Sequence, residues 1–296
     1  MKKLRKEDIS QEVFDLYDDY AHNNIDRREF MSKLSIYAVG GLTVSGLASM
    51  LLPNYAKGMS VKQGDPRITE AWIEYDSPKG AGKMKGLLVK PAEIKGKIPG
   101  IVVVHENRGL NPHIEDVARR AAVEGFLALA PDGLSPIGGY PGNDDDGKVM
   151  QRTLDAGKLF TDLLNGARYL KGHELSGGKL GATGFCYGGG VVNKLAVVMG
   201  TDLNAAAPFY GRAPATEDVT KIKAPLMIHY AEDDPRINAS SEAYRSALEK
   251  NGKDFVMYTY EGTRHGFHNN STPRYDEAQA NLAWERTMAF FKKHLS

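Results

Sequence analysis

The sequence predicts an α/β fold in which helices cover both faces of a mostly parallel, doubly wound sheet. A continuous β-branched run, "IPGIVVVHE" at 98–106, is typical of a strand buried on both faces. From about residue 59 onward, strand patterns and helix patterns alternate along the chain. The 296 residues, of which 42% are hydrophobic, are enough for one large core in a fold of this class.

Each predicted element follows from a local pattern. "AWIEYDS" (71–77) and "MKGLLVKP" (84–91) are expected to be outer antiparallel strands before the central one. "NPHIEDVARRAAVEGF" (111–126) has apolar residues at helical spacing, begins with Asn-Pro and ends at a glycine. Further strands are expected at 126–132, 179–185, 203–210, 224–231 and 254–262, and further helices near 148–172, from about 188, at 239–250 and at 276–295. "NDDDG" (143–147) is expected to be a polar surface turn.

Composition excludes several classes of function. The formal net charge of +1 provides no long-range field that would gather nucleic acid, so no nucleic-acid partner is expected. The chain has one cysteine, Cys186, which can form neither an internal disulfide nor a cysteine zinc cluster. Cys186 is therefore either a small buried residue or a working thiol.

Residues 1–58 form an N-terminal segment of different character, and residues 59–296 form the predicted catalytic domain. Arg27 and Arg28 precede a moderately apolar stretch at 34–52, and this order is similar to a twin-arginine export signal. Export would place the protein in the periplasm. The alternative is a pair of helices that pack on the body of a cytoplasmic protein. The glycines in the apolar stretch argue against a permanent membrane span.

The surroundings of Cys186 indicate a nucleophile. "GFCYG" (184–188) has the form G-x-C-x-G at a strand-to-helix junction, which is the nucleophile elbow of α/β-hydrolases with sulfur in place of a hydroxyl. Glycines two positions before and after the nucleophile avoid collisions with the neighbouring strand and helix. The helix N-terminus beside the sulfur is expected to favour the thiolate.

A base and an acid follow in the order that α/β-hydrolases use, which is nucleophile, acid and histidine. Asp233 and Asp234 come directly after one predicted strand, and His265 comes after the next. All three lie at the same edge of the sheet as Cys186, so the sequence predicts a Cys-His-Asp triad with either aspartate as its acid.

Residues 65–296 resemble the dienelactone hydrolase family, the cysteine branch of the α/β-hydrolases. The motifs that carry this resemblance are "VVVHENRGLNPHIEDVARRAA", "ALAPD", "GFCYGGG", "DDPRI", "RHGFHN" and "LAWERTMAFF". The resemblance implies that Cys186 is the nucleophile, His265 the general base and Asp234 the orienting acid. It also implies that Glu106 activates the thiol and that the backbone N–H groups of Asn107 and Tyr187 form an oxyanion hole. The expected reaction is hydrolysis of a small ester, lactone or thioester through an acyl-cysteine intermediate, without a cofactor or a metal.

The chain also departs from the family pattern. His268 and Asn269 stand where members that act on dienelactone carry an arginine for the substrate carboxylate. Arg108 and Arg212 are the first candidates for an alternative anion site, and Arg236 and Arg264 are further ones. No insertion long enough for a large lid is evident, so a shallow pocket is expected.

Two other classes of function remain open at this point. One is metal-assisted chemistry that uses the H-x-x-H pair His265 and His268. The other is a non-catalytic binding module built on the same fold.

Overall fold

The computed structural model describes residues 9–22, 24–38 and 43–296, and its body is built on one eight-stranded sheet. The spatial order of the strands is β1-β2-β4-β3-β5-β6-β7-β8. Strands β1 and β2 pair in an antiparallel manner, β2 joins β4 in the same way, and the other neighbours are parallel. The strands are β1 (Ile68–Ser77), β2 (Gly82–Pro91), β3 (Ile98–Val104), β4 (Leu127–Asp132), β5 (Ser176–Phe185), β6 (Ala205–Phe209), β7 (Leu226–Asp233) and β8 (Phe255–Arg264). The predicted fold class is confirmed.

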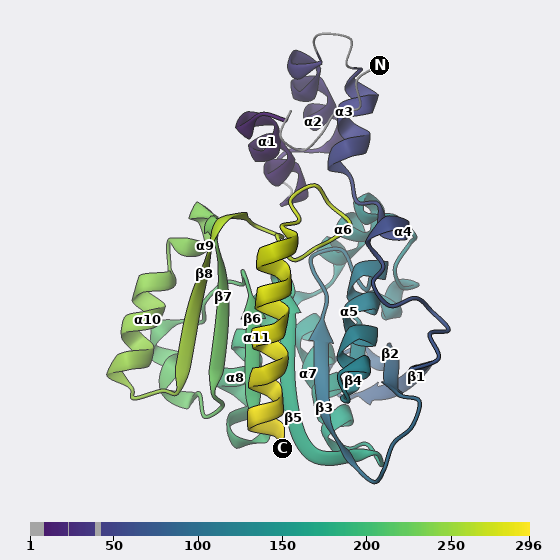
Figure 1. Cartoon of the computed structure of the whole chain (residues 1–296), viewed down its shortest axis with the longest axis vertical. Helices are drawn as coiled ribbons and strands as arrows, with labels where there is room; N and C mark the ends of the chain where they lie inside the picture. The colour runs from purple at the N-terminus through teal and green to yellow at the C-terminus, as the bar shows by residue number, and fades with distance from the viewer. Residues whose placement is uncertain (1–8, 23, 39–42) are drawn as a thin grey trace.

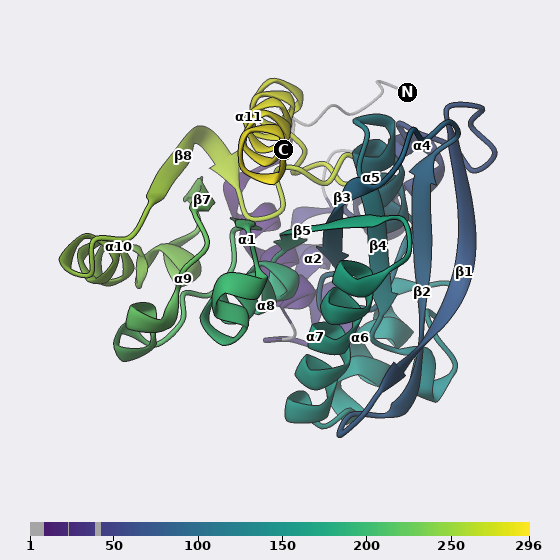
Figure 2. The ribbon, with the colours of Figure 1, turned by 90° about the horizontal axis from the view of Figure 1, so that it is seen from below.

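Helices cover both faces of this sheet, as Figure 2 shows. On one face, α5 (Pro112–Val123) and α11 (Glu277–Leu295) pack on the strands and form one apolar cluster. On the other face, α7 (Ala156–Gly172), α8 (Tyr187–Met199) and α10 (Ser241–Lys250) form the second cluster. Short helical turns are α9 (Pro235–Asn238), η2 (Ser35–Tyr37), η3 (Ser135–Ile137), η4 (Gly200–Asp202) and η5 (Thr216–Lys221).

The region expected to be one helix near 148–172 is instead two helices. Helix α6 (Asp144–Thr153) begins inside the segment expected to be a polar turn, because the Asn143 side chain accepts a hydrogen bond from the Asp146 N–H. Leu154 then adopts an extended conformation. The Asp155 side chain caps the start of α7 by accepting from the Lys158 N–H. The caps at Asn143 and Asp155, with extended Leu154 between the two helices, therefore divide the predicted single helix into α6 and α7.

The N-terminal segment folds into helices, three of which share an apolar core of their own: α1 (Gln11–Ala21), α2 (Arg27–Leu34) and α3 (Val44–Leu51). Tyr17, Phe30 and Leu34 are almost fully buried among them. A fourth helix, α4 (Tyr55–Gly58), lies against the body. This is the arrangement expected under the packed-helix alternative, and export remains a prediction. Across residues 9–22, 24–38 and 43–296, no helix combines the length and apolar character needed to cross a bilayer.

Helices α1 to α3 lie at the end of the molecule opposite the C-terminus, above the strand ends (Figure 1). Strands β5, β7 and β8 run parallel within one sheet, so their carboxyl ends reach the same edge. Helix α1 touches that edge, because Gln11 donates a hydrogen bond to Asp233 at the end of β7. The fold thus brings the N-terminal segment to the place where the predicted triad lies.

Candidate active site

Cys186 lies in a strained turn between β5 and α8. Its backbone has φ 55° and ψ −114°, a conformation that side-chain-bearing residues rarely adopt. A Cβ on Gly184 would lie 2.6 Å from the Gly188 carbonyl oxygen, and one on Gly188 would lie 2.3 Å from that of Val104. The two glycines are therefore needed for steric reasons, as the elbow motif predicts.

Asp234 and His265 form a hydrogen-bonded pair at the ends of β7 and β8. The Nδ1 of His265 lies 2.5 Å from Oδ2 of Asp234, and both side chains are buried. Asp233, the other candidate acid, instead faces Gln11 and Arg264. Of the two aspartates that the sequence left open, the structure brings Asp234 to the histidine.

The sulfur of Cys186 lies within 4.8 Å of ring nitrogens of both His265 and His22. Burial and, to a smaller extent, the negative charge of Glu106 raise the pKa of the thiol to about 11. Arg108, Arg236 and the backbone N–H of Tyr187 oppose that shift with smaller effects. The backbone N–H of Tyr187 at the start of α8 favours the thiolate, as expected from the elbow, but desolvation outweighs it and the thiol is protonated at rest.

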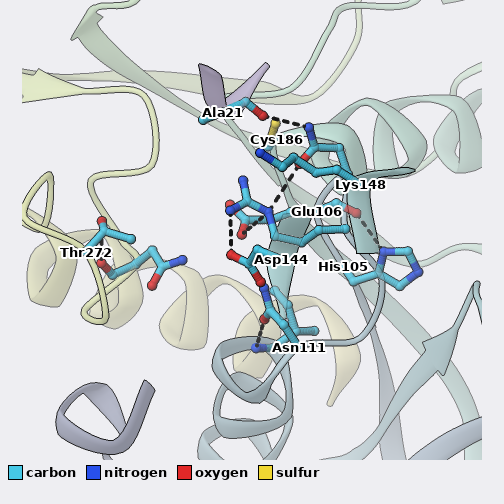
Figure 3. A network of polar contacts seen from close by, with 12 residues as sticks. Ala21, His105, Glu106, Asn111, Asp144, Lys148, Cys186 and Thr272 are labelled. Carbon is cyan, nitrogen blue, oxygen red and sulfur yellow. Dashed lines mark hydrogen bonds and ion pairs between the residues drawn. The ribbon is translucent and has the colours of Figure 1, made fainter. Parts of the chain in front are cut away.

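Glu106 lies below the thiol in a buried network of charges, which Figure 3 shows together with Asp144. Its Oε2 has no hydrogen-bond partner among the described residues and lies 3.8 Å from Nε of Arg108. The same guanidinium pairs with Asp144 at 2.8 Å. Arg108 is thus shared between two carboxylates. As a result, Oε2 of Glu106 accepts no hydrogen bond from the described residues and can accept a proton.

Arg108 is consequently not a residue of the pocket wall. Its side chain is 5% exposed, and its charge is taken up by Glu106 and Asp144. The hypothesis that Arg108 binds a substrate anion is therefore corrected, since binding would require the guanidinium to leave two carboxylates inside the protein.

The two predicted oxyanion donors, Asn107 and Tyr187, both line the pocket beside Cys186. Tyr187 is the first residue of α8, so its backbone N–H has no acceptor within the helix. The Asn107 side chain donates a hydrogen bond of 3.0 Å to the backbone oxygen of Ala21. This contact fixes the loop after β3 to the end of helix α1, and Figure 3 shows Ala21 beside Cys186.

The N-terminal segment contributes His22 to the site, which the sequence analysis did not foresee. His22 Nε2 lies 3.9 Å from the Cys186 sulfur, and its ring meets that of His265 edge to face at 4.6 Å. Burial and, to a smaller extent, neighbouring His265 lower the pKa of His22 to about 2. No local pattern around residue 22 points to residue 186, so only the docking of α1 could reveal the contact.

The pocket that opens at Cys186 has a volume of about 530 Å³, within the usual range for small-molecule sites. The end of α1 forms part of the pocket wall through His22, and the shallow pocket expected from the sequence stays a prediction. Apolar residues that include Phe160, Val191 and Ile237 line the interior.

Cationic side chains also contribute to the pocket wall. The sequence candidates Arg212 and Arg236 both line it, together with Lys194 and the acidic Asp218. Arg264, the remaining candidate, pairs with Asp15 and Asp233 and stacks on Phe14. The cations available to a bound anion are therefore Arg212 on the loop after β6, Lys194 on α8 and Arg236 on α9.

His268 does not join His265 at the site. Its imidazole is buried among aromatic rings, 4.9 Å from the ring of Phe185 and 5.8 Å from that of Trp284. His265 and His268 therefore do not form the metal site that was the alternative suggested by the H-x-x-H pair. The turn after β8 sends His265 toward the cysteine and His268 into the core.

Comparisons with known proteins find relatives that cover about three quarters of this chain. Protein usf from Aquifex pyrophilus is 35% identical over 240 residues, which span 76% of this chain and 98% of that protein. A Saccharolobus solfataricus protein named "Putative carboxymethylenebutenolidase" is 29% identical over 262 residues, with 76% and 98% coverage. The crystal structure titled "Putative Dienelactone Hydrolase" from Klebsiella pneumoniae superposes with a TM-score of 0.67 at 25% identity, covering 76% of this chain and 99% of that one.

Two family models match different parts of the sequence. A model described as YqhI-like matches residues 1–40, which include helices α1 and α2. The model of the dienelactone hydrolase family matches residues 84–295, which include every residue of the predicted triad. The elbow around Cys186, the strand order and this match over most of the sequence show that the chain belongs to the dienelactone hydrolase family of α/β-hydrolases.

Proposed function

We propose that this hydrolase cleaves a small ester, lactone or thioester through an acyl-cysteine intermediate formed on Cys186. The observation that carries the proposal is the convergence of a strained cysteine, a histidine bonded to a buried aspartate and two pocket-lining loops. Membership in a family of lactone and ester hydrolases supports the same reaction class.

In this mechanism the thiol is protonated at rest and is activated in the occupied site. Glu106, with one oxygen lacking a hydrogen bond, accepts the thiol proton when substrate displaces the water around the sulfur. The thiolate attacks the carbonyl carbon, and the backbone N–H groups of Asn107 and Tyr187 stabilise the oxyanion. Each such donor typically lowers the barrier by ~3 kcal/mol.

His265 transfers protons in the later steps. Its Nδ1–H donates to Asp234, which leaves the lone pair on Nε2 free to relay the proton that Glu106 took from the thiol to the leaving group. Water then attacks the thioester, and His265 takes a proton from this water as general base and returns it to the departing sulfur, which restores the thiol. Asp234 holds the ring in the required tautomer and stabilises its charged form.

The pocket chemistry favours an acyl or alcohol group that bears a negative charge. Arg212, Arg236 and Lys194 face the same space as the cysteine, and Asp218 is the acidic residue among the pocket-lining side chains. Small anionic esters or lactones with an apolar body would satisfy both the cations and the apolar wall.

The test of the nucleophile is Cys186→Ala assayed with small aryl esters such as p-nitrophenyl acetate. Hydrolysis is expected to be abolished, with unchanged folding by circular dichroism, because the tight turn accepts a smaller side chain. A variant that kept a tenth of the wild-type rate would rule out Cys186 as nucleophile. Cys186→Ser is also expected to be poor, since the hydroxyl has a much higher pKa than the thiol.

A further inference from the structure

Three side chains from distant parts of the chain meet at the thiol. Sulfur of Cys186 and one ring nitrogen each from His22 and His265 all lie within 4.8 Å of one another. The Sγ to Nε2 distance between Cys186 and His22 is 3.9 Å. These residues come from the end of α1, the start of α8 and the turn after β8, so only the folded chain places them together.

The hydrogen bonds of both imidazoles fix where their lone pairs lie. His22 Nδ1 is 2.8 Å from the backbone oxygen of Asp18, and since a carbonyl only accepts, Nδ1 carries the hydrogen. His265 Nδ1 donates in the same way to the carboxylate of Asp234. The lone pair of each ring is therefore on Nε2, and Nε2 of buried His265 has no hydrogen-bond partner among the described residues.

This combination is the one that proteins use to hold a transition metal. Metal-binding histidines typically donate their second N–H to a carboxylate or a backbone carbonyl, which orients the ring and strengthens the ligand. His265 has the carboxylate of Asp234 in that role, and His22 has the carbonyl of Asp18. A catalytic triad explains why His265 donates to Asp234. It does not explain why His22, with its Nδ1–H bonded to Asp18, presents Nε2 to the same thiol.

We propose that Cys186, His22 and His265 bind one divalent ion of the zinc class and that this binding reversibly inhibits the hydrolase. One thiolate and two neutral imidazoles suit zinc, whereas magnesium and calcium prefer oxygen ligands. A water molecule would complete the tetrahedron from the pocket that Cys186 and His22 line.

The geometry needs only a small adjustment. Zn–S and Zn–N bonds of about 2.3 and 2.0 Å place tetrahedral ligand atoms about 3.5 Å apart. The observed 3.9 Å between sulfur and His22 Nε2 must close by a few tenths of an ångström, and the other distances, which lie within 4.8 Å, by at most about 1 Å, which side-chain rotation can supply. On binding, the thiol loses its proton to solvent, the sulfur donates an electron pair to the ion, and no oxidation occurs.

Inhibition is expected because the ion would bind the two catalytic atoms, the sulfur of Cys186 and Nε2 of His265. This inhibition rests on the proposed function. The nucleophilic electron pair of Cys186 and the basic lone pair of His265 would both be bound to the metal. Neither could then attack a carbonyl or accept a proton. Removal of the ion would restore both groups.

The binding test uses the full-length protein, freed of metal with a chelator and titrated with Co²⁺ as a spectroscopic probe. One equivalent is expected to produce a sulfur-to-cobalt charge-transfer absorption, which Zn²⁺ abolishes by displacement. His22→Asn is expected to weaken Co²⁺ binding at least tenfold, because one of three protein ligands is lost. Asparagine keeps a donor for the Asp18 carbonyl and suits the helix C-cap that His22 occupies.

His294→Gln is the matched control, since this histidine lies in the last turn of α11 at the other end of the molecule. Its affinity for Co²⁺ should equal that of the wild type. Absence of the charge-transfer band, binding that His22→Asn leaves unchanged, or a loss that His294→Gln reproduces would each overturn the proposed site.

Activity separates this inference from the proposed function. If both are right, the chelator-treated enzyme hydrolyses aryl esters, Zn²⁺ inhibits it at one equivalent, and half-inhibition of His22→Asn requires at least tenfold more Zn²⁺. Hydrolysis that one equivalent of bound Zn²⁺ does not reduce would overturn the inhibition. A metal-free enzyme without hydrolysis, but with the cobalt band, would contradict the proposed function while leaving the metal site intact.

Discussion

Arg274 Nη1 donates to Asp18 Oδ1 at 2.5 Å, and this ion pair joins residues 256 positions apart in the sequence. Arg274 lies in the turn after His265 and is 2% exposed, while Asp18 belongs to helix α1 and is 25% exposed. The guanidinium also stacks on the ring of Tyr17 from the same helix. When the N-terminal segment docks on the catalytic domain, Asp18 therefore becomes the counter-ion of buried Arg274.

Asp18→Asn is expected to loosen that docking. Loss of the carboxylate leaves Arg274 buried without its counter-ion, which we expect to cost about 2 kcal/mol, less than for a fully buried pair because Asp18 is partly exposed. Limited proteolysis within residues 9–38 should then be faster by about thirtyfold, since cleavage follows the population of the open form. Asp15→Asn is the control, because exposed Asp15 lies 3.5 Å from Arg264, and its effect should be under about threefold. Equal cleavage of the two variants would contradict this account.

Asp234→Asn is expected to lower kcat/KM for aryl esters by at least about a hundredfold. Asparagine cannot stabilise the charged imidazole that forms when His265 accepts a proton. Adjacent Asp233→Asn should stay within about twofold of the wild type, because Asp233 is half-exposed and faces Gln11 and Arg264. Steady-state kinetics of the pair decides the matter, and a large loss in Asp233→Asn alone would reverse the assignment of the acid.

Alkylation of the thiol should be slow at neutral pH. The pKa of Cys186 is raised to about 11 from an ordinary value of 9.0, so its thiolate fraction at pH 7 is about a hundredfold below that of an ordinary cysteine. The rate with iodoacetamide should rise about tenfold per pH unit until the pH approaches 11. Because Cys186 is the only cysteine in the chain, mass spectrometry reports on it alone. A rate that is independent of pH above 7 would instead indicate a resting thiolate.

An anionic ester should react with a higher kcat/KM than its neutral isostere of equal size. Arg212 and Arg236 are exposed at the pocket, so we expect a preference of about tenfold, the low end for a charge-assisted pair. The preference should fall with added salt and should be lost in the variant Arg212→Ala or Arg236→Ala that removes the binding residue. Arg245→Ala on α10 is the control, since this partly exposed arginine pairs with Glu242 and does not line the pocket. Equal rates for the two substrates would favour a general small-ester hydrolase.

Export through the twin-arginine pair remains a prediction for the N-terminal segment. If Arg27 and Arg28 form an export address, fractionation of the source cell should find folded protein outside the cytoplasm. The double substitution Arg27→Lys with Arg28→Lys should return it, whereas Arg67→Lys in the body should not. Lysine at position 27 keeps the positive charge that faces Asp145 in the folded protein. A location that the double variant does not change would favour the packed-helix alternative.

The sequence by itself determined the order of the strands and of most helices in residues 59–296, although not the division between α6 and α7, and it identified the main residues of the candidate site. Buried strands such as 98–104 carry a continuous apolar pattern, and caps such as Asn111 mark where helices begin. The glycines around Cys186 identify the elbow because steric exclusion acts between residues close in sequence. His265 and an aspartate could be assigned to one sheet edge because parallel strands end there.

Only the tertiary structure decided what surrounds Cys186, Asp234 and His265. The burial of Arg108 between two carboxylates, the raised pKa of Cys186 and the position of His268 in the aromatic core each depend on several elements packed together. The approach of His22 to the thiol depends on docking across more than half of the chain. Desolvation and long-range docking depend on which groups exclude water from one another in three dimensions, and no periodic pattern along a sequence encodes that.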